Sequence, residues 1–84
     1  MLSVHYFASV REQLARAHDE IDKPQEVTSV RELMQLLADL DPEFARLTTT
    51  DNALLVAVNQ TVVALDHPLA DNDEVAFFPP MTGG

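Results

Sequence analysis

The spacing of apolar residues changes twice along this chain, and those changes limit the folds open to it. Leu2–Phe7 alternates side chains with the period of a half-buried strand. Val30–Leu40 instead places its apolar residues three and four positions apart, which gives one apolar helix face. Glu74–Phe78 returns to the strand period. Strand periodicity at both ends, with helical periodicity between them, predicts an α+β fold.

The remaining segments complete a mixed sheet with helices packed on one face. The predicted strands are Leu2–Phe7, His18–Asp22, Leu54–Val58, Thr61–Ala64 and Glu74–Phe78. The predicted helices are Val10–Ala17, Val30–Leu40 and Pro42–Leu47, the last of which would bury Phe44 and Leu47. Both terminal strands carry apolar residues on both faces, so we expect them in the centre of the sheet. The chain would then leave from the middle of the sheet rather than from an edge.

Short motifs mark the helix ends and one hairpin. Ser9-x-x-Glu12 and Ser29-x-x-Glu32 match the capping box, in which the serine hydroxyl accepts from a free amide and the glutamate reaches back. Asp41-Pro42 has the form of an N-cap followed by proline at the first helical position. Asn59-Gln60 separates two apolar runs, and asparagine tolerates the left-handed backbone of tight hairpins.

Charge and composition exclude several classes of function. Five basic residues stand against fourteen acidic ones, which gives a formal net charge of −9. Binding to nucleic acid or to anionic membranes relies on clustered Lys and Arg, so we expect neither partner. The chain has no cysteine, which excludes disulfides and a thiol nucleophile. No apolar run approaches the roughly 20 residues of a membrane span and no basic leader is visible, so we expect a cytoplasmic protein.

The body of the domain offers little for catalysis. His5, His18 and His67 lack the spacing of a helical metal pair, so no metal site is expected. The paired carboxylates fall in predicted loops and on polar helix faces, where they would be solvated. No glycine-rich loop is present to hold phosphate. We therefore expect that the chain is not an enzyme by itself.

The glycines are confined to the end of the chain. An average sequence of this length would have about six, whereas this one has two, Gly83 and Gly84. Residues 1–78 are predicted to form the domain and residues 79–84 an extended tail of Pro79, Pro80, Met81, Thr82, Gly83 and Gly84. Two prolines would stiffen this tail, and two residues without Cβ would let it enter a narrow slot. The Gly84 carboxylate would become reactive once activated with ATP, which suggests a carrier arm.

Three apolar residues predict a docking surface beside the tail. Phe7 and Phe78 point away from the core on strands that should be adjacent, and Val62 could join them from the hairpin. Exposed aromatic side chains next to a protruding tail are typical of an interface. The alternative is that the first helix covers Phe7.

The last third of the chain carries three pieces that identify a family. They are Ala57-Val58-Asn59-Gln60-Thr61, Asp66-His67-Pro68-Leu69 and Asp73-Glu74-Val75-Ala76-Phe77-Phe78-Pro79-Pro80-Met81-Thr82-Gly83-Gly84. Together they resemble the MoaD-like sulfur carriers, the small subunits of molybdopterin synthase. The resemblance is strongest over about the last thirty residues. One departure is Asn72, where such carriers often have glycine, but asparagine also accepts a left-handed turn.

The resemblance implies a fold and a mechanism. The fold would be the ubiquitin-like β-grasp. A ubiquitin-activating-type adenylyltransferase would use ATP and Mg²⁺ to adenylate the Gly84 carboxylate, and a sulfurtransferase or desulfurase would supply the sulfur of a thiocarboxylate. The tail would insert into the large synthase subunit, within a heterotetramer, and donate sulfur to cyclic pyranopterin monophosphate. Phe7, Val62 and Phe78 would contact that subunit, and no cofactor would be bound to the small one.

Three other functions remain open: a second sulfur carrier, a protein modifier and a plain interaction domain. A thiamine-pathway sulfur carrier shares the fold and the Gly-Gly end, but the Phe-Phe-Pro-Pro segment and the long helix fit molybdopterin synthase better. A protein modifier would instead form an isopeptide bond between Gly84 and a lysine. An interaction domain with an inert tail is the third possibility.

Overall fold

Five strands form one mixed sheet in the computed structural model, which describes residues 1–49 and 54–79. They are β1 (Leu2–Tyr6), β2 (His18–Ile21), β3 (Leu55–Val58), β4 (Thr61–Val62) and β5 (Glu74–Phe78), in the spatial order β2-β1-β5-β3-β4. β1 and β5 run parallel, and the other neighbouring strands run antiparallel. The predicted central place of the two terminal strands is confirmed, because β5 lies in the middle and β1 lies beside it.

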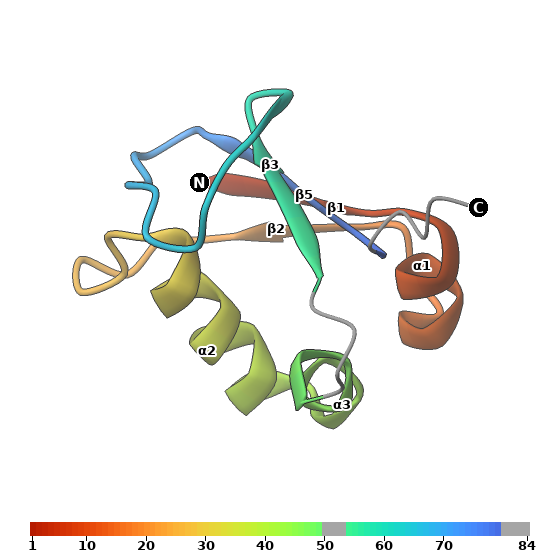
Figure 1. Ribbon diagram of the computed structural model, residues 1–84. Helices are drawn as coiled ribbons and strands as arrows, with labels where there is room; N and C mark the ends of the chain where they lie inside the picture. Colours follow the sequence, from red (N-terminus) through yellow and green to blue (C-terminus); the bar gives the residue numbers. More distant parts are fainter. Residues whose placement is uncertain (50–53, 80–84) are drawn as a thin grey trace.

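Three helices accompany the sheet within the described residues: α1 (Ala8–Leu14), α2 (Val30–Leu40) and α3 (Pro42–Thr49). Figure 1 shows α2 and α3 on one side of the sheet and α1 at the end where β1 finishes. The apolar stripe of α2 buries Val30, Leu33 and Leu37 against the strands. The predicted α+β architecture, with helices on one face, is therefore confirmed.

The core lies between this helix layer and the two central strands. The parallel register sets Val4 beside Val75 and Tyr6 beside Phe77, and all four side chains are buried. Phe44 of α3 packs its ring edge against Phe77, with ring centroids 5.3 Å apart. The prediction that α3 buries Phe44 is confirmed, while Leu47 is partly buried at the margin of the core.

Two of the predicted N-caps are present. The Ser29 hydroxyl accepts a hydrogen bond from the Glu32 amide at 3.4 Å, and α2 has the predicted bounds. The Glu32 carboxylate reaches back to the amide of Thr28 at 2.9 Å, one residue before the expected serine amide, and hydrogen bonds from Thr28 lower the pKa of Glu32. The Asp41 carboxylate accepts from the Glu43 amide at 2.9 Å and so begins α3.

The predicted capping box at Ser9 is wrong. α1 begins at Ala8 and ends at Leu14, earlier at both ends than Val10–Ala17, and its N-cap is Phe7 without a side-chain cap bond. Ser9 therefore lies inside the first turn rather than before it. The helix ends early because Ala15 is left-handed and because the Ala17 carbonyl accepts from the Tyr6 amide at 2.9 Å, which commits this segment to the sheet.

The predicted hairpin is confirmed at Asn59-Gln60, where φ is 50° and 71° as a tight primed turn requires. The Asn59 side chain accepts from the Glu74 amide at 3.0 Å, which ties the turn to β5. β4 ends at Val62 rather than Ala64, and β3 begins at Leu55 rather than Leu54. None of the described helices is both long and apolar enough to span a membrane.

Candidate functional site

The face of the sheet opposite the helices carries a continuous set of cross-strand neighbours. Residues paired across neighbouring strands form rows that run across the sheet. The first row, in order from β2 to β4, is His18, His5, Ala76, Ala57 and Val62. A second row pairs Phe78 with Leu55. A third pairs Ser3 with Glu20 and Glu74. This open face therefore changes from apolar at the end of β5 to acidic at its start.

Phe7 extends the apolar end of the open face. It follows β1 in extended conformation, and its amide donates to the Phe77 carbonyl at 3.1 Å, which places it next to Phe78. The side chain of Phe7 is 50% exposed, so α1 does not cover it. Phe78 is half-buried, and Val62 is 62% exposed on the edge strand β4. The structure thus puts the three predicted contact residues on accessible surface, and their role in binding stays a prediction.

The tail begins at the apolar end of the open face. Because β1 and β5 are parallel, Phe7 and Phe78 lie at the same end of the sheet, where the chain continues into Pro79. Proline has no amide to continue the ladder, which agrees with the end of β5 at Phe78. The other predicted tail residues, Pro80, Met81, Thr82, Gly83 and Gly84, lie outside the described residues.

A histidine pair lies on the β1–β2 side of the open face. The His5 and His18 rings have centroids 4.8 Å apart, and His5 Nε2 lies 3.7 Å from a Glu74 carboxylate oxygen. The His5 ring also stacks on Phe7 at 6.4 Å. The spacing of the histidines along the sequence did not predict this pair, because only the register of β1 with β2 brings the two rings together. In the described part of the chain, no three acidic or histidine side chains gather closely enough to hold a metal ion.

An ionic network on the helix side of the sheet was also missed by sequence analysis. Arg16 donates to Asp19 at 2.6 Å and to Asp41 at 2.8 Å, and the Tyr6 hydroxyl donates to Asp19 at 2.9 Å. The Arg16 bond lowers the pKa of Asp41, while burial and the Asp19 bond raise the pKa of Tyr6 to about 12. The network ties the segment after α1 to β2 and to the start of α3, so its place is structural.

The fold defines the class of protein first. A mixed sheet with parallel central strands, packed against one long helix, is the ubiquitin-like β-grasp, which confirms the expected fold. The crystal structure of SAMP1 from Haloferax volcanii superposes with a TM-score of 0.79 at 26% sequence identity, covering 99% of this chain and 98% of that one.

The sequence then places the chain within that class. It belongs to the ThiS family, whose sequence model matches residues 4–84. The molybdopterin synthase sulfur carrier subunit of Escherichia coli (strain K12) is 46% identical over 84 residues, which is 100% of both chains. The protein of the same name from Haemophilus influenzae is 37% identical, again over 100% of both chains.

Proposed function

We propose that this chain is the sulfur carrier subunit of a molybdopterin synthase. The observation that carries the proposal is the meeting of two features at one end of the sheet. The exposed Phe7 and the half-buried Phe78 lie where β5 passes into the Pro79 segment that leads to Gly83 and Gly84. A partner bound to these rings would therefore be in reach of the tail. The full-length relatives with this name support the same function.

In this proposal the reacting group is the Gly84 carboxylate. A ubiquitin-activating-type adenylyltransferase uses ATP and Mg²⁺ to form an acyl-adenylate and releases pyrophosphate. The outer sulfur of a persulfide on a sulfurtransferase or desulfurase attacks the acyl carbon and expels AMP, and a second thiol then cleaves the acyl disulfide, which leaves the thiocarboxylate on Gly84 and a disulfide on the donor. The resulting thiocarboxylate donates sulfur to cyclic pyranopterin monophosphate in the large subunit of a heterotetramer. The small subunit binds no cofactor of its own and works in the cytoplasm.

Deletion of Gly84 tests this function. In a reconstituted reaction with the activating enzyme, a sulfur donor, ATP, Mg²⁺, the large subunit and the pterin substrate, the deletion should reduce product to background. The melting temperature should stay unchanged, because every core residue of the described chain precedes Phe78. Gln25→Ala, in an exposed loop, is the matched control and should keep full product. Product formation by the deleted chain, or a steep fall in its melting temperature, would contradict the proposal.

The protein modifier and the thiamine-pathway carrier predict other outcomes. A protein modifier would appear in cell extract as high-mass conjugates joined through Gly84 to lysine. If the chain were a thiamine-pathway carrier, its deletion would leave molybdopterin formation unchanged. The identity of the full-length relatives favours the molybdopterin reaction over both.

A further inference from the structure

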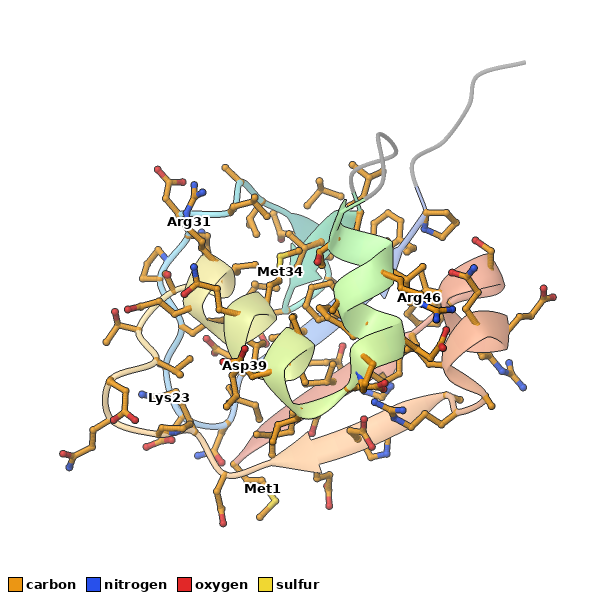
Figure 2. All side chains as sticks on the ribbon, turned by 90° about the horizontal axis from the view of Figure 1, so that it is seen from below. Met1, Lys23, Arg31, Met34, Asp39 and Arg46 are labelled. Carbon is orange, nitrogen blue, oxygen red and sulfur yellow. The ribbon has the colours of Figure 1, made fainter. Side chains whose placement is uncertain are left out.

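The outer edge of β2 borders a groove that is separate from the open face. Among residues 1–49 and 54–79, β2 pairs with β1 only, and Figure 2 shows it along the rim of the sheet. The groove has a volume of about 470 Å³ and lies between β2 and the junction of α2 with α3. Its lining includes Arg16, Asp19, Glu20, Ile21, Leu40 and Asp41.

The register of β2 leaves backbone groups available at this edge. In an antiparallel ladder, every second residue pair exchanges both backbone hydrogen bonds. The Tyr6 amide donates to the Ala17 carbonyl at 2.9 Å. In the same alternation, Asp19 and Ile21 are the β2 residues whose backbone groups bond to β1. The N–H and C=O groups of His18 and Glu20 therefore point away from β1. These are the groups with which a further strand would pair.

The groove also offers an apolar contact. Ile21, at the end of β2, is half-buried, whereas Leu40, at the end of α2, is 68% exposed. Leu40 is the most exposed large apolar side chain among the described residues. One aliphatic side chain placed between Ile21 and Leu40 would remove both from water, which favours binding in proportion to the apolar area buried.

The charge of the groove selects the kind of occupant. Arg16 is already held by Asp19 and Asp41, at 2.6 Å and 2.8 Å, so its charge is satisfied from within the chain. Glu20 alternates with Asp19 and Ile21 and turns its side chain to the open face, so the β2 edge as a whole, with Asp41 beside it, presents three carboxylates against one guanidinium. A basic segment would complement this excess. A second copy of β2 would bring acidic side chains opposite one another, which is unfavourable.

We propose that the β2 edge and this groove bind an extended, basic segment of a partner protein. The segment adds a strand to β2 through the backbone of His18 and Glu20, places an aliphatic side chain between Ile21 and Leu40, and sets basic side chains near the carboxylates. The proposal is independent of the sulfur chemistry, since the groove lies on the helix side of the sheet beside β2, whereas the tail follows β5, which β1 separates from β2.

The test uses the full-length ¹⁵N-labelled chain and a capped peptide, Lys-Val-Lys-Ile-Lys-Val-Lys, observed by NMR at physiological salt. We expect saturable shifts of backbone amides in His18–Ile21 and at the end of α2. Exchange of the Glu20 amide with solvent should slow, because that amide gains a partner. A peptide with glutamate in place of every lysine should not bind.

Two pairs of variants separate the apolar and backbone contributions. Leu40→Ser, which removes the apolar contact without changing the charge, should weaken peptide binding by about tenfold or more, as for the anchor of an interface. Val62→Ser, at a similarly exposed apolar position on the open face, is its matched control and should leave the affinity unchanged. Glu20→Pro should abolish binding while the β1–β2 ladder survives, because proline is tolerated where the amide faces outward. Glu20→Gln, which keeps the amide, should reduce the affinity only partly.

Several results would overturn the proposal. Shifts centred on His5, Ala76 and Val62 would move the binding to the open face. Equal affinity of Leu40→Ser and wild type, or diffuse shifts that vanish at physiological salt, would reduce the effect to nonspecific attraction of charge. Shifts in β2 that depend on protein concentration without peptide would make a second copy the occupant.

Discussion

Single residues in the turns adopt a backbone conformation that usually favours glycine. Ala8, Ala15, Asn59, Gln60 and Asn72 all have positive φ, between 50° and 71°. For residues with a Cβ this conformation costs about 1–2 kcal/mol, less for asparagine. The Asn72 turn was expected from the sequence, whereas nothing in the sequence marks Ala8 or Ala15. The domain therefore turns without glycine, and both glycines stand at the end of the tail.

Ala15→Gly should stabilise the domain. Ala15 is exposed and ends α1 with φ of 59°, so glycine relieves the Cβ contact at a helix terminus where it is the favoured residue. We expect a gain of about 0.5–1 kcal/mol in the free energy of unfolding, measured by urea denaturation. Ala17→Gly, also exposed but without positive φ, is the control and should destabilise. Equal destabilisation by both variants would contradict the left-handed conformation of Ala15.

Tyr6→Phe should make stability independent of pH in the alkaline range. The pKa of Tyr6 is raised from 10.0 to about 12 by burial and by its bond to Asp19. Wild-type stability is therefore complete below pH 10 and falls as the pH rises toward 12, because the unfolded chain loses the phenolic proton first. Tyr6 is the single tyrosine, so phenolate absorbance reads its pKa directly. A midpoint near 10 in the folded protein would contradict the buried hydrogen bond.

The same substitution should also lower stability at neutral pH. Loss of the 2.9 Å bond from the Tyr6 hydroxyl to Asp19 should cost about 1–2 kcal/mol. Asp19 keeps its bond to Arg16, so the remaining network limits the loss. Chemical denaturation at pH 7 measures the difference, and a stability equal to that of wild type would show that the hydroxyl contributes nothing.

Whole elements were predictable where periodicity and capping act together. α2 has the expected bounds because a long apolar stripe and the Ser29 cap agree. α1 was displaced because its ends depend on the pairing of Ala17 with β1, a contact that local sequence does not encode. The open face followed from the parity of Phe7 and Phe78. The Arg16 network and the His5–His18 pair did not, since they need the register of β1 with β2.

Asp41 joins two elements, and its removal should show both roles. Its carboxylate begins α3 through the Glu43 amide and binds Arg16 beside β2. Asp41→Ala should cost about 1–2 kcal/mol, and Asp41→Asn, which can still cap the helix, should cost less. The bond from Arg16 lowers the pKa of Asp41 below its ordinary value of 3.8. The charged carboxylate therefore stabilises the folded protein above pH 3.8, and this contribution is lost as the pH falls through the pKa of the folded state. Chemical denaturation measures the free energy of unfolding of wild type and both variants. The three values should differ at pH 7 and should converge in acid.

At the scale of the whole molecule, the two faces of the sheet differ: one carries the core and the other exposes apolar side chains. The helices cover the face that carries the core, while Phe7 and Val62 stay exposed on the other. The parallel pairing of β1 with β5 brings the apolar end of that open face to the start of the tail. A partner could thus hold the domain by its face and receive the tail in a separate slot.

Phe78→Ala should weaken binding to the large synthase subunit by about 1–3 kcal/mol, as expected for an aromatic anchor at an interface. Isothermal titration calorimetry with the purified large subunit measures the change. Leu40→Ala, an exposed apolar residue on the helix side, is the control and should bind that subunit as wild type does. Unchanged affinity of Phe78→Ala would remove this residue from the interface.

The central claim is that Gly84 carries sulfur, and the most direct measurement is high-resolution mass spectrometry of the C-terminal peptide after gentle purification from the native host. Exchange of one oxygen for sulfur adds about 16 Da, close to oxidation of Met81, so the sample is also treated with a thiol-directed alkylating agent. The chain has no cysteine, so an alkylated C-terminal peptide would place the sulfur at Gly84, which is the result we predict. A bare carboxylate throughout, even after incubation with ATP, a sulfur source and host extract, would contradict it.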